Sequence, residues 1–215
     1  MVLAEDAMDD RPSTAVLGFR PHTYWTAVVA LAGPSDAPRV VARRRVVFAA
    51  GRERFVYHQA ALEPAKAHAL IDAVRAATQA NAAREIGDLI ADLGCDGVEV
   101  RLAVAPTGAT KLPQGLEEIL RVHARIHAAE GEFYREVVAS ACGGLGLEVR
   151  RVVERHLPGL LGKTLRIDGA TLEARLKAMG AALGPPWNED YRLATQAAWL
   201  HLDAAAEAQG RTPCS

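Results

Sequence analysis

The sequence contains no apolar run long enough to cross a membrane. The longest, such as TAVVALAG beginning at Thr26, are far shorter than the roughly 20 residues that a membrane-spanning helix needs. Cysteine is also scarce: Cys95, Cys142 and Cys214 are odd in number, and none is spaced as in a CxxC motif. This argues against a disulfide framework or a cysteine-based zinc site, and we expect a reducing, cytoplasmic setting.

A strong net charge is absent as well. The 25 Lys and Arg residues nearly balance the 26 Asp and Glu residues, which leaves a formal net charge of −1. The whole molecule therefore has no field that would attract nucleic acid, although a local basic patch would do so. Apolar residues form 50% of the 215-residue chain and charged residues 24%, which is typical of a globular domain with a real core.

The beginning of the chain contrasts with this composition. MVLAEDAMDDRP contains four acids and has no apolar segment behind a basic start. We therefore expect a disordered acidic tail over 1–13 rather than a signal peptide. We expect a single domain over 14–206 and a flexible tail over 207–215.

The apolar pattern predicts an α/β protein with a mixed sheet. Three segments rich in Val and aromatic residues, separated by turns that contain Pro or Gly, predict an antiparallel meander. Two later β-branched segments predict further strands between helices. The expected strands are 16–20, 26–32, 39–48, 98–104 and 147–154, and the expected helices are 64–94, 115–144, 171–183 and 188–206. This order predicts one five-stranded sheet flanked by helices, with the last two strands parallel to the first.

Several motifs follow one another along this pattern. GFRPH at 18–22 ends the first strand, VVERHLP at 152–158 ends the fifth, and LLGKTLRIDGATLEARLKAMGAALG and NEDYRLATQAAWLHL follow it. Over about two-thirds of the chain, this ordered set resembles the RuvC family of Holliday-junction resolvases, whose corresponding motifs read like GIDPG, VAEYSP, VKQAVTG and DAADALAVALxH. The resemblance implies a ribonuclease-H-like fold and nucleic acid as a partner.

The resemblance also implies metal-dependent chemistry, for which this chain lacks most of the acids. The family holds two metal ions with several carboxylates, but Arg20 stands at the first Asp and Arg101 at the Glu of the fourth strand. Only Asp190 remains of a pair of Asp in the final helix. A guanidinium stays protonated and has no acceptor, so it cannot bind a metal ion. We therefore expect no resolvase-type nuclease activity, and an ion pair of Arg20 with Asp190 or Glu154.

A second group of polar residues lies in the predicted helix 115–144. His123, His127 and Glu130 are spaced i, i+4 and i+7, and they fall on the same side as the apolar stripe. We expect their side chains to lie within reach of one another and to be mostly shielded from water. Two alternatives remain open: a satisfied hydrogen-bond network, which the sequence favours, or a divalent metal held by two imidazoles and a carboxylate.

Two further residues are candidates because of where the pattern places them. His58 lies in an ordered-looking loop after the third strand, from which it could approach the same helix. Glu154 ends a strand, where α/β sheets usually present functional groups. The candidate catalytic residues are therefore Glu130, Glu154, Asp190 and His58.

These observations lead to two hypotheses from different classes. The first is a non-nucleolytic RuvC-like protein with a binding or regulatory role toward nucleic acid or another protein. The second is an enzyme with a site rebuilt from His and Glu, of the metal-dependent hydrolase type. A third possibility is a structural partner or homo-oligomer without a small-molecule site, and we expect no membrane partner. A separate feature is the basic run Arg43, Arg44 and Arg45 in the third predicted strand. Because side chains alternate along a strand, Arg43 and Arg45 share one face of it, and Arg44 points to the other.

Overall fold

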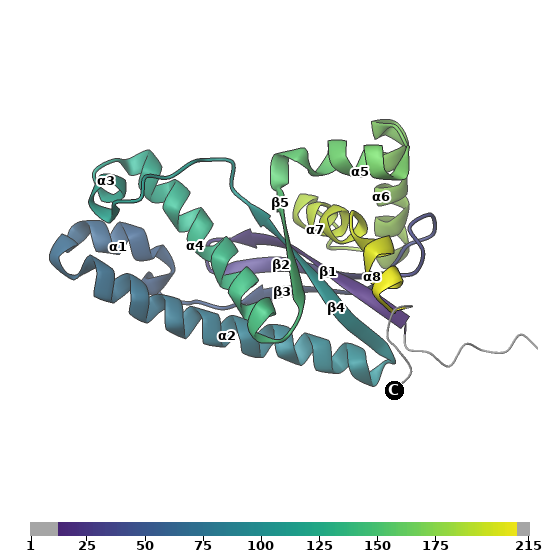
Figure 1. Ribbon diagram of the computed structural model, residues 1–215, viewed down its shortest axis with the longest axis horizontal. Helices are drawn as coiled ribbons and strands as arrows, with labels where there is room; N and C mark the ends of the chain where they lie inside the picture. The colour runs from purple at the N-terminus through teal and green to yellow at the C-terminus, as the bar shows by residue number, and fades with distance from the viewer. Residues whose placement is uncertain (1–12, 210–215) are drawn as a thin grey trace, which may run out of the picture.

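A five-stranded mixed sheet forms the centre of the molecule in the computed structural model, which describes residues 13–209 (Figure 1). The strands are β1 Ser13–His22, β2 Trp25–Ala32, β3 Arg39–Val47, β4 Val98–Thr107 and β5 Glu148–Val153. Their order is β3-β2-β1-β4-β5. The first three strands are antiparallel, β4 is parallel to β1, and β5 is parallel to β4. The predicted sheet is confirmed in its membership and in its strand directions.

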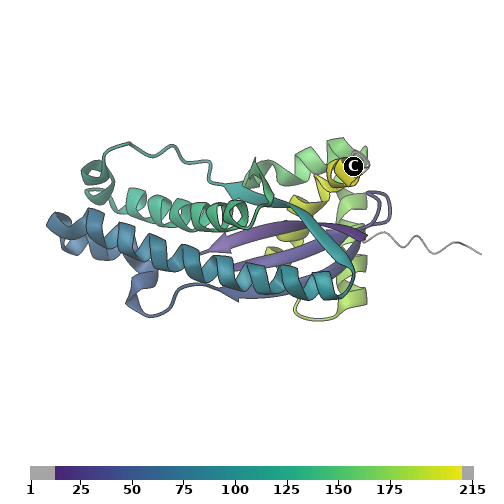
Figure 2. The same cartoon turned by 60° about the horizontal axis from the view of Figure 1, so that its bottom comes forward.

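Helices cover both faces of this sheet. On one side lie α1 Val56–Leu62, α2 Ala67–Cys95, α3 Leu116–Leu120 and α4 His123–Gly144, and on the other lie α5 Leu157–Leu165, α6 Gly169–Leu183, α7 Glu189–Trp199 and α8 Leu202–Gln209. Figure 2 shows α2 and α4 running side by side and extending past the ends of the strands. As a result, α1 and α3 lie at an end of the molecule beyond the strands.

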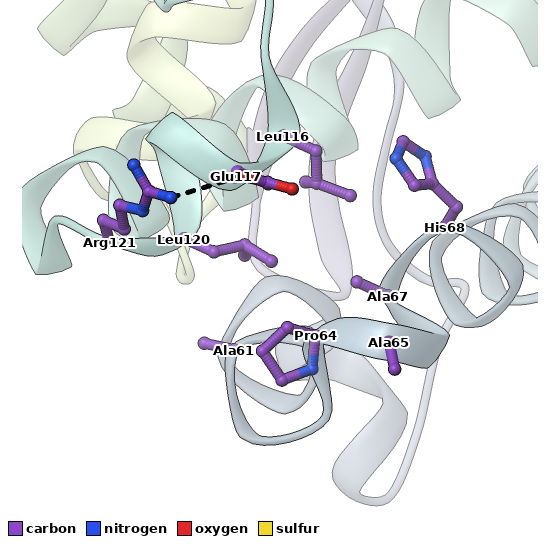
Figure 3. Close-up of a pocket in the computed structure, with 9 residues that line it drawn as sticks. All are labelled: Ala61, Pro64, Ala65, Ala67, His68, Leu116, Glu117, Leu120 and Arg121. Carbon is purple, nitrogen blue, oxygen red and sulfur yellow. Dashed lines mark hydrogen bonds and ion pairs between the residues drawn. The ribbon is translucent and has the colours of Figure 1, made fainter.

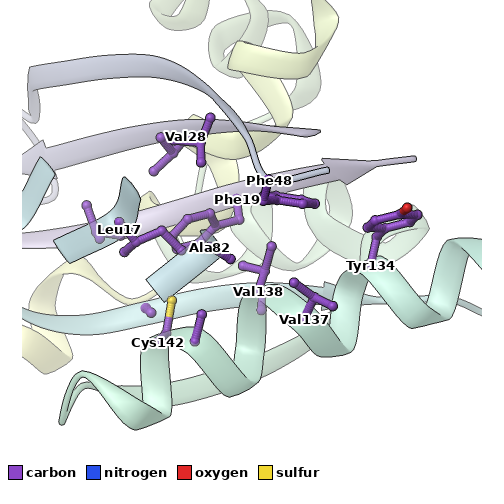
Figure 4. Packing of buried hydrophobic residues seen from close by; sticks show 14 of the residues in the cluster. Leu17, Phe19, Val28, Phe48, Ala82, Tyr134, Val137, Val138 and Cys142 are labelled. Carbon is purple, nitrogen blue, oxygen red and sulfur yellow. The ribbon is translucent and has the colours of Figure 1, made fainter. Parts of the chain in front are cut away.

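The alternation of side chains along β1 divides the core into two parts. Leu17 and Phe19 point toward α2 and α4, where they pack with Val138 and other apolar residues (Figure 4). Val16 points to the opposite face and packs with residues of α5, α6 and α7. Because both faces of β1 are buried, its sequence is apolar almost throughout, as expected for a central strand.

The packing between β1 and α7 brings their backbones into direct contact. A Cβ placed on Gly18 would lie 1.9 Å from the carbonyl oxygen of Ala194 and 2.7 Å from the backbone nitrogen of Ala198. These are backbone atoms of a helix, so they cannot rotate away. Glycine at this position therefore lets the α7 backbone rest directly on the strand.

Two helices were missed by the sequence prediction, and two predicted helices are divided. His58 lies in α1 rather than in a loop, and α5 was not expected. The predicted helix 115–144 is interrupted at Val122, whose backbone is extended (φ −128°, ψ 113°), so that α4 begins at His123. The predicted final helix is likewise divided into α7 and α8. Short apolar stretches carry little periodicity, which explains why α1 and α5 were missed.

The predicted tails, 1–13 and 207–215, lie within the described residues only at Ser13 and at 207–209. Ser13 belongs to β1, and Glu207–Gln209 continue α8; the rest of both segments lies outside the described residues. Between residues 13 and 209, the structure contains no helix with the length and apolar character needed to cross a membrane.

The contact at Gly18 can be tested by substitution. We expect Gly18→Ala to lower the free energy of unfolding by about 1–3 kcal/mol or more, because the new methyl group overlaps fixed backbone atoms. Denaturant unfolding measures this change. Gly94→Ala is the matched control, since nothing lies within 4 Å of a Cβ at that helical glycine and alanine favours helix there. Equal effects of the two substitutions would contradict the assigned contact.

Candidate functional site

The first candidate site is where β1, β4 and β5 end, beside the start of α7. Because side chains alternate along a strand, Arg20 and His22 share the α7 face with Gly18. Glu154 comes directly after β5, and Asp190 lies in the first turn of α7. We call Arg20, His22, Glu154 and Asp190 the strand-end corner. They come from three separate parts of the sequence, and the packing of Gly18 against α7 brings the last of them into place.

Arg20 forms an ion pair with Glu154. Its Nε lies 3.3 Å from Oε2 of the carboxylate, and about a quarter of each side chain is exposed. The guanidinium also donates a hydrogen bond to the carbonyl of Pro21. Of the two partners expected for Arg20, the structure therefore selects Glu154 and leaves Asp190 for another residue.

Asp190 pairs instead with His22, a residue that the sequence analysis did not single out. The His22 Nε2 atom lies 2.6 Å from Oδ1 of Asp190. The imidazole stacks on Trp25, with ring centroids 4.3 Å apart and an interplanar angle of 8°. The guanidinium of Arg45 lies 4.4 Å from the centroid of the same indole. A histidine at the end of a strand gave no sequence signal for this pairing. The pairing depends on where α7 begins, which the sequence does not show.

Arg101 does not reach the strand-end corner, which corrects the placement implied by the motif alignment. β4 pairs with β1 such that Ala15 faces Val100 and Val16 faces Leu102, so Arg101 is the extra residue of an irregularity. Arg20 lies four residues farther along β1 than Val16. Arg101 makes its ion pair within its own strand, with Glu99 at 2.9 Å. A register shift of this kind is set by strand pairing and cannot be seen in a motif.

The charges at the strand-end corner are therefore balanced in pairs. Each of its two carboxylates has a cationic or protonatable partner from β1. In the part of the chain that the structure describes, the one group of three His, Cys, Asp or Glu side chains with ligand atoms close enough for a metal ion lies elsewhere. The carboxylate set that two-metal phosphodiester chemistry requires is not assembled here among the described residues.

The second candidate site lies between α1 and the start of α4. His58 comes from α1, His123 is the first residue of α4, and His127 lies one turn later. One nitrogen from each ring lies within 4.8 Å of the others. The Nε2 atoms of His123 and His127 are 2.9 Å apart, and Nδ1 of His58 lies 2.5 Å from Oε2 of Glu130. We call the three imidazoles the histidine cluster.

Glu130 lies beneath the histidine cluster and is only 3% exposed. Burial raises the pKa of its carboxyl, and the His58 imidazole opposes this shift. Its Oε2 bonds to His58, whereas its buried Oε1 has no hydrogen-bond partner among the described residues. The backbone N–H groups of Tyr57 and His58, at the start of α1, also lower the pKa of this carboxyl. Glu130 is therefore a buried acid held mainly by one imidazole.

The expectation that His123, His127 and Glu130 are all shielded from water is wrong for the two histidines. Glu130 is buried as expected, but His123 and His127 are exposed. The reason is that α4 begins beyond the ends of the strands, near α1 and α3, so the sheet does not cover its first turns (Figure 1). Desolvation lowers the pKa of His127, and the imidazoles of His123 and His58 lower it further.

The sequence grouped His123 and His127 with Glu130, whereas the structure groups them with His58. Glu130 reaches the cluster only through His58, because its side chain points into the core. His58 was recognised as a candidate that could approach this helix. What the sequence did not show was the helix α1 that fixes the position of its ring.

A cavity of about 370 Å³ lies near this end of the molecule, between η2 Pro64–Lys66 and α3 (Figure 3). Its walls are mostly apolar, including Ala61 and Leu116, and an exposed ion pair between Glu117 and Arg121 lies at its edge. None of the residues of the strand-end corner or of the histidine cluster lines it. The cavity therefore adds no chemistry to either candidate site.

Comparison with known proteins identifies the fold. No protein-family model and no curated protein matches this chain. Among solved structures, Thermus thermophilus RuvC in complex with a Holliday junction substrate matches with a TM-score of 0.51 and 12% identity, covering 92% of this chain and 96% of that chain. A second structure of T. thermophilus RuvC matches with a TM-score of 0.51 and 11% identity, covering 91% and 96%.

The chain has a RuvC-like, ribonuclease-H-like fold. This likeness confirms the fold that the ordered motifs implied. At 11–12% identity it identifies the fold alone and assigns no role to any residue.

The raised pKa of Glu130 has a consequence for stability that can be measured. A carboxyl whose pKa is higher in the folded than in the unfolded state stabilises the folded state. This stabilisation is fully present at pH values below the ordinary carboxyl pKa of 4.5, and it is lost as the pH rises through the pKa of the folded state. A glutamine amide in its place cannot titrate. We therefore expect the free energy of unfolding of Glu130→Gln, relative to the unmodified chain, to increase as the pH rises above about 4.5.

Urea unfolding over a series of pH values, in buffer with a chelator, measures this difference. Glu136→Gln is the control, because Glu136 lies on the same helix with about half of its side chain exposed and pairs with Arg151. A difference that stays constant with pH for Glu130→Gln would show that burial does not raise the pKa of this carboxyl.

Proposed function

We propose that this chain is a RuvC-like protein that binds nucleic acid without cleaving it. The observation that carries the proposal is the pairing of charges at the strand-end corner: Arg20 with Glu154, and His22 with Asp190. A regulatory role, in which the bound chain protects or marks its nucleic acid, follows from binding without cleavage.

The pairing argues against metal-dependent cleavage in two ways. A phosphodiester displacement with two metals needs several carboxylates around the same pair of ions. Glu154 and Asp190 are each occupied by a side chain from β1. In addition, the guanidinium of Arg20 stays protonated at any working pH, so it places a fixed positive charge where a divalent cation would have to bind.

The same change suits the corner to contact a nucleic acid directly. Neutralised carboxylates no longer repel phosphate, so a metal is not needed to bridge protein and nucleic acid. Trp25 lies beside His22, and the exposed Arg45 lies over its ring. Aromatic and guanidinium groups of this kind bind single-stranded or splayed bases and phosphates with little sequence preference. Because the net charge of the chain is −1, such binding depends on this local group.

A four-way junction is the natural first probe, because a structural neighbour was solved with a Holliday junction substrate. We expect the full chain to leave this junction intact in Mg²⁺ or Mn²⁺ and to bind it in a gel-shift or anisotropy assay. Arg45→Ala should weaken binding and reduce the slope of log affinity against log salt by about 1. Arg84→Ala is the control, because Arg84 is equally a surface arginine but lies on α2, across the sheet.

Three outcomes would overturn the proposal. Junction cleavage that disappears in Asp190→Asn would show that the strand-end corner retains nuclease chemistry. Absence of binding to the junction, to single strands and to duplexes would leave a protein partner, or a second copy of the chain, as the occupant of the corner. Equal binding by Arg45→Ala, Arg84→Ala and the unmodified chain would place the contact elsewhere.

The second candidate function is a metal-dependent hydrolase, and the histidine cluster is the observation that favours it. Three histidines with an open fourth position can bind a metal that activates water for hydrolysis. Glu154 and Asp190 take no part in this hypothesis, because both are paired at the strand-end corner. Zinc-dependent hydrolysis of bis(p-nitrophenyl) phosphate, abolished by His127→Ala but not by Arg20→Ala, would favour this function over the first.

A further inference from the structure

We propose that His58, His123 and His127 form a binding site for one zinc-class divalent ion, which joins α1 to the start of α4. The inference rests on the geometry of these side chains and on the buried acid beneath them. It is independent of nucleic-acid binding at the strand-end corner and requires no catalytic activity.

The donor atoms already lie close to the arrangement that zinc requires. With Zn–N distances of about 2.0–2.1 Å and tetrahedral angles, ligand nitrogens lie about 3.3 Å apart. The Nε2 atoms of His123 and His127 are 2.9 Å apart, and the nitrogen contributed by His58 lies within 4.8 Å of both. His123 and His127 are exposed, so small rotations of their side chains open this spacing without moving the backbone.

The backbone holds the three rings in this position. A spacing of four residues places His123 and His127 on adjacent turns of one helix face. The ring of His58 is fixed from α1, with its centroid 4.7 Å from that of His127 and 5.6 Å from that of His123. Two ligands from one helix and a third from a neighbouring element make a site that exists before the metal arrives.

Glu130 gives the site the supporting acid found behind many metal-binding histidines. Its Oε2 lies 2.5 Å from Nδ1 of His58, which leaves Nε2 of His58 as the nitrogen available to an ion. A carboxylate that accepts from the far nitrogen of a ligand fixes the ring and increases its affinity for metal. Oε1 of Glu130 is buried without a hydrogen-bond partner among the described residues. A cation on His58 would compensate a buried negative charge that is otherwise incompletely satisfied.

The ligand types select the class of ion. Neutral imidazoles favour Zn²⁺, Co²⁺, Ni²⁺ and Cu²⁺, whereas Mg²⁺ and Ca²⁺ favour oxygen ligands. Three protein ligands leave a fourth position for water or for a group from a bound partner. Since two of the rings are exposed, an ion reaches the site from solvent without any opening of the fold.

The experiment uses the full chain without a histidine tag, stripped with chelator and titrated with ZnCl₂. We expect one equivalent of zinc to bind and the melting temperature to rise, because the ion binds the folded state. Co²⁺ in place of zinc should give the visible absorption of a tetrahedral site. His127→Ala should abolish both responses, and His156→Ala, which removes an exposed histidine outside the cluster, should leave both unchanged.

The role of Glu130 needs a variant that keeps the shape of the side chain. We expect Glu130→Gln to bind the same single equivalent of zinc about 10–100-fold more weakly. Circular dichroism of each metal-free variant tests whether it folds, so that loss of zinc binding is not confused with loss of structure. If His127→Ala impairs folding, His123→Gln provides the second test, since His123 begins the exposed first turn of α4.

Three results would overturn the metal site. The first is zinc binding that is weak and without fixed stoichiometry. The second is equal zinc binding by His127→Ala and His156→Ala. The third is a melting temperature that chelator and zinc leave unchanged, which would show that the histidine cluster is a hydrogen-bond network only. Failure of junction binding would bear on the proposed function alone, because Arg45 and the histidine cluster are tested by separate variants.

Discussion

The direct contact between the backbone of α7 and the central strand β1 determines how the functional end of this protein is built. At Gly18 there is no Cβ, and the carbonyl of Ala194 occupies the space that a side chain would need. At this point the helix backbone therefore lies directly on the strand. Its first turn is then close enough to the end of β1 for Asp190 to bond to His22 at 2.6 Å. A larger residue at position 18 would separate the two elements and the pair.

The strand-end corner pairs each of its two carboxylates with a side chain of β1. Carboxylates gathered at the ends of neighbouring strands repel one another, and a cation must compensate them. Here the compensating cation is the guanidinium of Arg20, a side chain of β1, which forms an ion pair with Glu154. The positive charge that compensates Glu154 is thus carried by a residue of β1.

The histidine cluster follows from a different feature, the length of α2 and α4. Both helices continue past the ends of the strands, and their outer ends lie near α1 and α3 rather than on the sheet. Polar side chains there are reachable by solvent, while Glu130, farther along α4, is already buried. Between the two sites, the Tyr134 hydroxyl donates a hydrogen bond to the carbonyl of Arg54, whose guanidinium lies 5.1 Å from the ring of Tyr24 in the β1–β2 turn.

The sequence by itself determined which five segments form strands, because apolar alternation and the Gly- and Pro-containing turns are local properties of the chain. The helices between the later strands then indicated that these run parallel to the first. The sequence also determined that Arg20 cannot be a metal ligand, since that depends only on the chemistry of the guanidinium. Tertiary structure alone decided the partners. The strand register separated Arg101 from Arg20, the start of α7 joined Asp190 to His22, and α1 brought His58 to His127. These contacts depend on how distant elements pack, and no local pattern in the sequence encodes them.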